Sequence, residues 1–279
     1  MELRVTSVEI GPELAATWLE KNVSNRPVRR HWVITLAKCM TMGRWIDNGS
    51  MIQFDERGNL FDGQHRLLAI IKSGVTVRMM VRFHAPEGTD KITDIGMVKR
   101  MSDIKPLENA NVIYASIRFL LAYESEGTSG RQSSKMMAWE VEDVFARHPN
   151  LKDWAIAGRA IAKQLSKGGL SGGPATFLAY LIGSVGTDQS RQFLAQLETG
   201  IGIEEGTPIL AYRSVMIGGS ASRVRDHNVS IAAIARGIVA WNATCLGRSL
   251  ARIIWTRNDM PECIGSPVVR GVAKAEVPV

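Results

Sequence analysis

The chain has 279 residues, of which 45% are hydrophobic and 22% are charged, and its formal net charge is +7. This composition is typical of a globular protein and excludes a wholly disordered chain. No apolar run approaches the roughly 20 residues that span a bilayer, and the first residues lack the layout of a signal peptide. We therefore expect a cytoplasmic protein with no membrane partner. Three widely separated cysteines without a C-x-x-C pair fit a reducing compartment and exclude a zinc ribbon.

Residues 1–105 predict a compact α/β domain. Alternating apolar and polar residues indicate a strand at the start, and helical periodicity follows on both sides of a turn at Asn25-Arg26-Pro27. A hairpin, a helix and a strand rich in β-branched residues come next. The expected order is strand, helix, helix, hairpin, helix and strand, at about 3–10, 11–21, 29–42, 51–61, 66–72 and 75–83.

The sequence beyond Lys105-Pro106 predicts a second, all-helical domain over 106–266, followed by a flexible tail over 267–279. Strand patterns are almost absent there, and glycine-rich joints separate the helical segments. The expected fold class is therefore α+β, an α/β domain followed by a helical one. The helices are expected at about 109–124, 133–147, 150–166, 174–185, 188–199, 207–217 and 229–247.

The segment Asp62-Gly63-Gln64-His65-Arg66 stands where the second hairpin strand gives way to a helix. Backbone N–H groups at a helix start lack intrahelical partners and favour anions. Gly63 lets the backbone approach a ligand closely, and Arg66 can offer a forked contact to phosphate. Asp62 and His65 add a titratable pair. These residues predict a phosphate-binding loop.

The stretch from Asn25 to Phe83 resembles the ParB/sulfiredoxin superfamily. ParB domains carry an Asn-Pro-x-x-x-Arg region and later Gly-Glu-Arg-Arg-x-x-Ala. Here these places are taken by residues 25–30, Asn-Arg-Pro-Val-Arg-Arg, and 63–69, Gly-Gln-His-Arg-Leu-Leu-Ala. In ParB the two motifs hold the phosphates of CTP, and in sulfiredoxin a Gly-Cys-His-Arg loop cradles those of ATP. The resemblance covers residues 1–110. It leaves the cofactor open, with a nucleotide and Mg²⁺ as the candidate, and it implies as phosphate- or nucleotide-binding residues Gly63, Gln64, His65, Arg66, Arg26, Arg29 and Arg30.

The motif departs from both relatives at Gln64. Sulfiredoxin has its catalytic cysteine there, so sulfinic-acid reduction is disfavoured, because glutamine cannot form the sulfur intermediate. Gln64 and His65 also replace the Glu-Arg pair of ParB. The Asp-Gly-Gln-His-Arg variant is similar to that of ParB-like proteins from bacteria and phages, many of them linked to DNA modification, restriction or partition.

The second half of the chain carries a basic region. Over 213–257 seven arginines face only one acidic residue, Asp226. A solvated helical surface and a nucleic-acid-facing surface both fit this bias. The arginines expected to contact DNA are Arg223, Arg225, Arg248 and Arg252. The spacing of the histidines, His148 among them, does not indicate a metal site, and an oligomer is compatible with the sequence.

The sequence therefore predicts a DNA-associated ParB-like protein, a DNA-binding regulator or host-directed phage factor with a phosphate- or nucleotide-binding loop. The alternative is a metal-dependent nuclease or a nucleotide hydrolase for CTP or ATP, in which His65 and Asp62 are catalytic. A single carboxylate in the loop weighs against it, since metal-dependent phosphoryl chemistry usually recruits several. A third reading is a protein-interaction module that binds neither nucleotide nor DNA.

Overall fold

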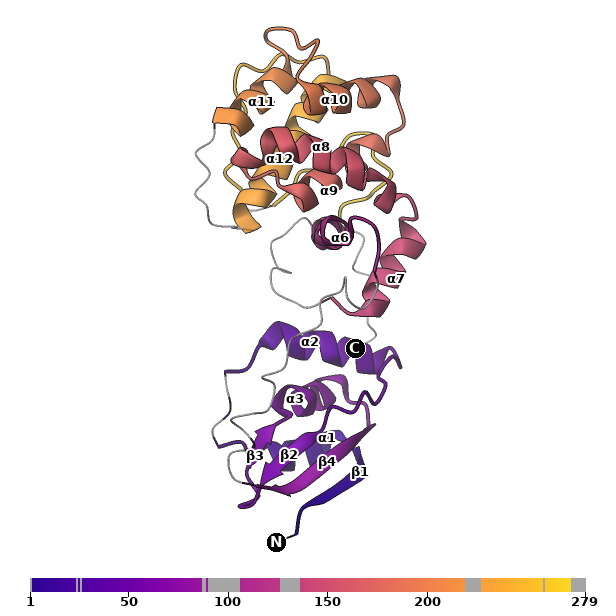
Figure 1. Cartoon of the computed structure of the whole chain (residues 1–279), viewed down its shortest axis with the longest axis vertical. Helices are drawn as coiled ribbons and strands as arrows, with labels where there is room; N and C mark the ends of the chain where they lie inside the picture. The colour runs from indigo at the N-terminus through magenta and orange to yellow at the C-terminus, as the bar shows by residue number, and fades with distance from the viewer. Residues whose placement is uncertain are drawn as a thin grey trace. The chain divides into compact units, whose positions relative to one another are not determined.

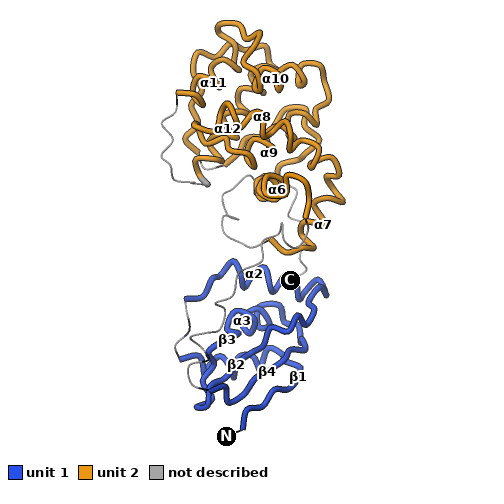
Figure 2. Tube along the Cα trace, in the orientation of Figure 1, with its two compact units in different colours: residues 1–98, 133–135 blue, residues 99–132, 136–279 orange. Residues whose placement is uncertain are grey.

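The computed structural model describes residues 2–23, 25, 27–86, 89, 106–125, 136–218, 227–257 and 259–271. The chain forms two compact units, coloured separately in Figure 2. Unit 1 comprises Met1–Val98 with Ser133–Lys135, and unit 2 comprises Lys99–Gln132 with Met136–Val279. A mixed four-stranded sheet with helices comes first and a mainly helical region follows, which confirms the α+β class.

The sheet of unit 1 has the strand order β1-β4-β2-β3. β4 pairs antiparallel with β1 and parallel with β2, and β3 pairs antiparallel with β2 as the return of a hairpin. The inner position of β4 explains its apolar, β-branched sequence, because both of its edges are paired and Val81 is fully buried. The bounds are β1 (Arg4–Ile10), β2 (Ile52–Asp55), β3 (Leu60–Asp62) and β4 (Val77–Ala85).

The described part of unit 1 also contains the helices α1 (Pro12–Leu19), α2 (Arg30–Thr41) and α3 (Gln64–Ser73), which are seen with the sheet in Figure 1. α3 packs against both α1 and α2. α1 is held to the sheet by Trp18, whose ring meets Phe54 and Phe83 edge-on, with centroid distances of 5.3 and 6.1 Å. These aromatic contacts add to the burial that fixes α1 on the sheet.

α3 begins two residues earlier than the periodicity predicted, at Gln64 instead of Arg66. The prediction relied on apolar side chains, whereas the first turn contains Gln64 and His65, which are polar. Both are nevertheless buried, with only 3% and 7% of their surface exposed. A pattern of apolar residues cannot reveal polar side chains that are buried through hydrogen bonds.

Unit 2 contains a helix at each segment predicted beyond Pro106, but the one predicted over 133–147 begins only at Ala138, and residues 133–135 lie outside the described residues. The predicted segment 150–166 is divided, because a short 3-10 turn, Leu151–Trp154, precedes α8, and a second, Ser166–Gly168, follows it. The bounds are α6 (Ala110–Glu124), α7 (Ala138–Arg147), α8 (Ala155–Leu165), α9 (Gly172–Gly183), α10 (Asp188–Thr199), α11 (Pro208–Gly218) and α12 (His227–Cys245).

α9 is the central helix of unit 2. Nearly all of its residues are buried, and α6, α8, α10 and α12 pack around it. A helix that is apolar on every side has to be surrounded in this way. α8 approaches α9 closely at Gly158, where an added Cβ would lie only 2.4 Å from the Cα of Thr176. None of the described helices is long and apolar enough to cross a membrane.

The predicted flexible tail, 267–279, falls partly within the described chain. Val268 is 4% exposed, and the N–H of Gly271 donates to the carbonyl oxygen of Tyr123 at 3.3 Å. Residues 267–271 therefore pack on unit 2, so the ordered part of this unit extends past 266. Residues 272–279 lie outside the described residues.

Candidate functional site

The predicted phosphate-binding segment lies at the turn from β3 to α3. β3 ends at Asp62, Gly63 is the N-cap of α3, and the helix begins with Gln64. Gly63 has a φ of +109°, a backbone conformation that side chains disfavour. An added Cβ would lie 2.5 Å from Cδ1 of the fully buried Ile52. Glycine is therefore required here both by the backbone and by the close approach of β2.

Asp62 and Arg66 pair across this turn. Nη2 of Arg66 donates to Oδ2 of Asp62 at 3.0 Å, and the two side chains are 14% and 21% exposed. The same carboxylate oxygen accepts from Nε2 of Gln53 at 3.3 Å, and Oε1 of Gln53 accepts from Arg82 at 3.4 Å. The sheet thus holds Asp62, which orients the guanidinium of Arg66 at the helix start. A guanidinium has five N–H donors, so the pair leaves donors for a further oxygen ligand.

His65 joins the starts of two helices. Its Nε2 accepts the backbone N–H of Arg29, the N-cap of α2, at 3.0 Å. An accepting Nε2 carries no proton, so the neutral ring is protonated on Nδ1. His65 therefore positions the first turn of α2 beside the first turn of α3. In this state Nε2 is engaged, and it can act as a general base only after releasing the amide of Arg29.

Gln64 ties the same turn to the connection between α1 and α2. Its Oε1 accepts from Nδ2 of Asn22 at 3.2 Å, and Asn25 donates to both Asn22 and the carbonyl oxygen of Leu60, at 2.6 and 2.8 Å. The predicted turn at residues 25–27 is thus anchored on β3 and α3. Arg26 lies outside the described residues.

The first turn of α2 is unusually basic. Arg29 is its N-cap, Arg30 is its first residue, and no acidic residue stands in that turn. Both arginines are exposed, and neither guanidinium forms an ion pair with another described residue. A helix start carries a partial positive charge that normally favours acidic side chains by about 0.3–1 kcal/mol each. Two arginines at such a place concentrate positive charge where an anion would be stabilised.

The structure thus brings together most of the residues predicted from two distant motifs. Gly63, Gln64, His65 and Arg66 form the start of α3, and Arg29 is bonded to it directly. Arg30 follows in the same turn of α2. Asp62 is present, but its oxygen is occupied by Arg66 and Gln53. Among the described residues, no group of three or more histidine, cysteine or acidic side chains is placed to hold a metal ion.

The arginines predicted to contact DNA are described only in part. Arg248 and Arg252 are exposed in the segment after α12, and neither forms an ion pair with another described residue. Arg223 and Arg225 lie outside the described residues. Arg213, from the same basic region, is buried, with Nη1 donating to the carbonyl oxygen of Leu197 at the end of α10. The Arg213 side chain therefore hydrogen-bonds a carbonyl group in the last turn of α10 and does not face solvent.

A buried polar cluster in unit 2 escaped the sequence analysis. The carboxylate of Glu124 accepts from Arg147 and lies 2.8 Å from Nε2 of His148, while Nδ1 of His148 lies 2.8 Å from the hydroxyl of Tyr180. Burial raises the pKa of Glu124, but the hydrogen bonds from His148 and Arg147 outweigh it and leave that pKa below its ordinary value. These residues come from three helices, so no local spacing could have indicated the cluster.

Comparison of the chain with protein-family models, with curated proteins and with solved structures finds no match. The local geometry is therefore the basis for inferring what this site binds.

Proposed function

We propose that unit 1 is a phosphate-binding module of the ParB/sulfiredoxin kind and that the protein associates with DNA. The phosphate-bearing group would lie at the start of α3. The hydrogen bond from the Arg29 N–H to His65 carries this proposal, because it joins two helix starts and their basic side chains at one place. That bond connects the two sequence motifs on which the family resemblance depends.

The chemistry of this place suits a phosphate. The start of α3 is the positive end of a helix, and its N-cap, Gly63, brings no side chain that would keep a ligand away. The guanidinium of Arg66 is oriented by Asp62, and Arg29 and Arg30 add two further positive charges at the start of α2. Amide donors at a helix start together with arginine forks are the usual means of holding phosphate.

The loop fits a nucleotide's phosphate better than a directly bound Mg²⁺. Asp62 is the one carboxylate of the Asp62–Arg66 segment, and its Oδ2 is engaged by Arg66 and Gln53. A magnesium ion usually needs carboxylate ligands that are free to bind it. The chain's own donors would therefore hold the phosphate.

A hydrolase is less well supported than a binding protein. The proposed base, His65, already accepts an amide through Nε2, and the proposed acid, Asp62, is ion-paired. Reduction of a sulfinic acid is disfavoured as well, because Gln64 supplies no thiol. For DNA association, the support is the net charge of +7 and the exposed, unpaired Arg248 and Arg252 among the described residues.

Calorimetric titration with phosphate, CTP and ATP tests this proposal. Arg66→Ala should weaken binding by about 1.5–3 kcal/mol, the range for a charged hydrogen-bond partner. Arg66→Lys, which keeps the charge but loses the fork, should be intermediate. Arg78→Ala is the matched control, because Arg78 on β4 forms an exposed ion pair with Glu9 of the neighbouring strand β1. Equal affinity in the wild type and Arg66→Ala would remove Arg66 from the site.

A further inference from the structure

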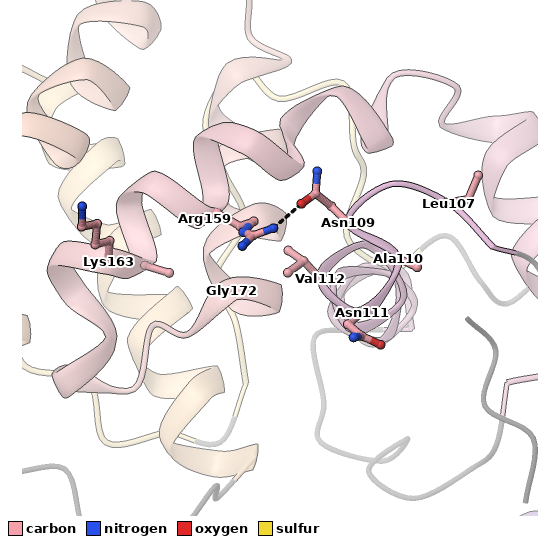
Figure 3. Close-up of a pocket in the computed structure, with 9 residues that line it drawn as sticks. Leu107, Asn109, Ala110, Asn111, Val112, Arg159, Lys163 and Gly172 are labelled. Carbon is pink, nitrogen blue, oxygen red and sulfur yellow. Dashed lines mark hydrogen bonds between the residues drawn. The ribbon is translucent and has the colours of Figure 1, made fainter. Parts of the chain in front are cut away.

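Unit 2 contains a pocket of about 620 Å³ that the function proposed for unit 1 does not use. α8 lines it with Arg159 and Lys163, the start of α6 lines it with Asn109 and Asn111, and Gly172 adds the start of α9 (Figure 3). We call it the α6–α8 pocket. None of its lining residues belongs to unit 1.

The charged side chains of this pocket all have the same sign. Arg159 and Lys163 lie four residues apart on α8 and so share one face of the helix, an arrangement of like charges that weakens a helix slightly. Neither forms an ion pair with another described residue, and no carboxylate is among the lining residues. The contact of Arg159 in the pocket is with the neutral amide oxygen of Asn109, as Figure 3 shows. The lining therefore contains no negative side chain that would balance the charges of Arg159 and Lys163.

Two asparagines, a glycine and four apolar residues complete the lining; the apolar residues are Leu107, Ala110, Val112 and Ala162. Asn109 and Asn111 bring side-chain amides, and Gly172 brings the start of α9. Neither helix has a side-chain cap at its first turn. Two cations and two side-chain amides around one hollow without a carboxylate favour an oxyanion over a metal ion, and the apolar residues leave room for an apolar part of the same ligand. The volume exceeds what a lone carboxylate needs and leaves room for a phosphate with the group that carries it.

We propose that the α6–α8 pocket binds a phosphate group, separately from the loop at Gly63–Arg66. Arg159 would supply a forked contact and Lys163 a point charge, while the side-chain N–H of Asn109 would donate to a phosphate oxygen. The phosphate could belong to a small soluble molecule or to a DNA strand, and both sources present the same chemistry to the pocket.

Titration of the full-length chain with inorganic pyrophosphate tests the proposal. The titration uses an Arg66→Ala background, so that failure of the unit 1 site cannot be confused with failure of this one. In that background we expect saturable binding to persist, and the added pair Arg159→Gln and Lys163→Gln should weaken it at least about tenfold. Lys152→Gln, an exposed lysine outside the pocket, is the matched control and should leave the affinity unchanged.

Two further measurements complete the test. Amide chemical shifts of Asn111 and Gly172 should move with pyrophosphate in the Arg66→Ala protein, a readout that does not require the double variant to fold. Repeating the titration with a duplex oligonucleotide identifies the source of the phosphate. If the double variant weakens binding of the DNA alone, the phosphate belongs to a DNA strand. If it weakens binding of pyrophosphate, the phosphate belongs to a small molecule. The proposal would be overturned if the double variant binds both probes as tightly as the Arg66→Ala protein and if the amide signals of Asn111 and Gly172 do not move.

Discussion

Replacement of Gly63 by alanine tests whether the turn before α3 is built as described. The φ of +109° is strained for any residue with a side chain. The new Cβ would also lie 2.5 Å from Cδ1 and 3.3 Å from Cα of Ile52. The flexible end of that side chain can give way, but Ile52 is fully buried and its backbone belongs to β2. Gly63→Ala should therefore displace β2 or the start of α3.

The expected magnitude has two parts. A left-handed backbone costs a residue with a side chain about 1–2 kcal/mol, and overpacking a well-filled site costs about 1–3 kcal/mol. Gly74→Ala separates them, because Gly74 at the other end of α3 has a φ of +68° and nothing within 4 Å of an added Cβ. Gly74 lies inside the left-handed region and Gly63 outside it, so the difference between the two variants should be the packing part of about 1–3 kcal/mol together with the additional backbone strain at Gly63.

Hydrogen exchange read by mass spectrometry on peptides of α3 and β2 is the suitable assay. Because the chain has two compact units, a single transition for the whole molecule is not assured, and peptide-level exchange reports unit 1 by itself. Gly63→Ala should lower the opening free energy of these peptides more than Gly74→Ala does. Equal effects of the two variants would refute the close contact with Ile52.

Other consequences can be measured independently. His65→Leu removes the acceptor of the α2 N-cap amide and should cost about 0.5–1.5 kcal/mol, with faster exchange of that amide; unchanged exchange there would contradict the bond. The pKa of Glu124 lies below its ordinary value, so its carboxylate stabilises unit 2 fully at neutral pH and loses this effect as the pH falls through the lowered pKa. Glu124→Gln should therefore reduce the loss of unfolding stability measured as the pH falls from 7 to 3. The same pH dependence in the variant and the wild type would contradict this. Replacing Arg248 and Arg252 by alanine should weaken DNA binding and reduce its salt slope by about 2, while Arg191→Ala serves as control.

The sequence was sufficient for the order of elements because each carries its own periodicity. The apolar spacing of α2 and the β-branched run of β4 predicted these elements to within a few residues. The start of α3 was misplaced because Gln64 and His65 are buried by hydrogen bonds to distant segments, which leave no apolar pattern.

The geometry of the site was predictable only in part. The motif identified Gly63 and Arg66 by residue type, since a positive φ and a forked donor each favour one kind of side chain. The engagement of His65 by the amide of Arg29 was not predictable, because 36 residues separate the two partners. The pocket at Arg159 and the cluster at Glu124 likewise depend on the packing of helices that are far apart in sequence.

Backbone amide chemical shifts on addition of CTP or ATP with Mg²⁺ test the central claim most directly. The proposed site predicts saturable shifts of the Gly63, Gln64 and His65 amides, with an affinity that falls in Arg66→Ala and not in Arg78→Ala. Shifts confined to other parts of the chain, or unchanged spectra at millimolar nucleotide and phosphate, would contradict a phosphate site at the start of α3.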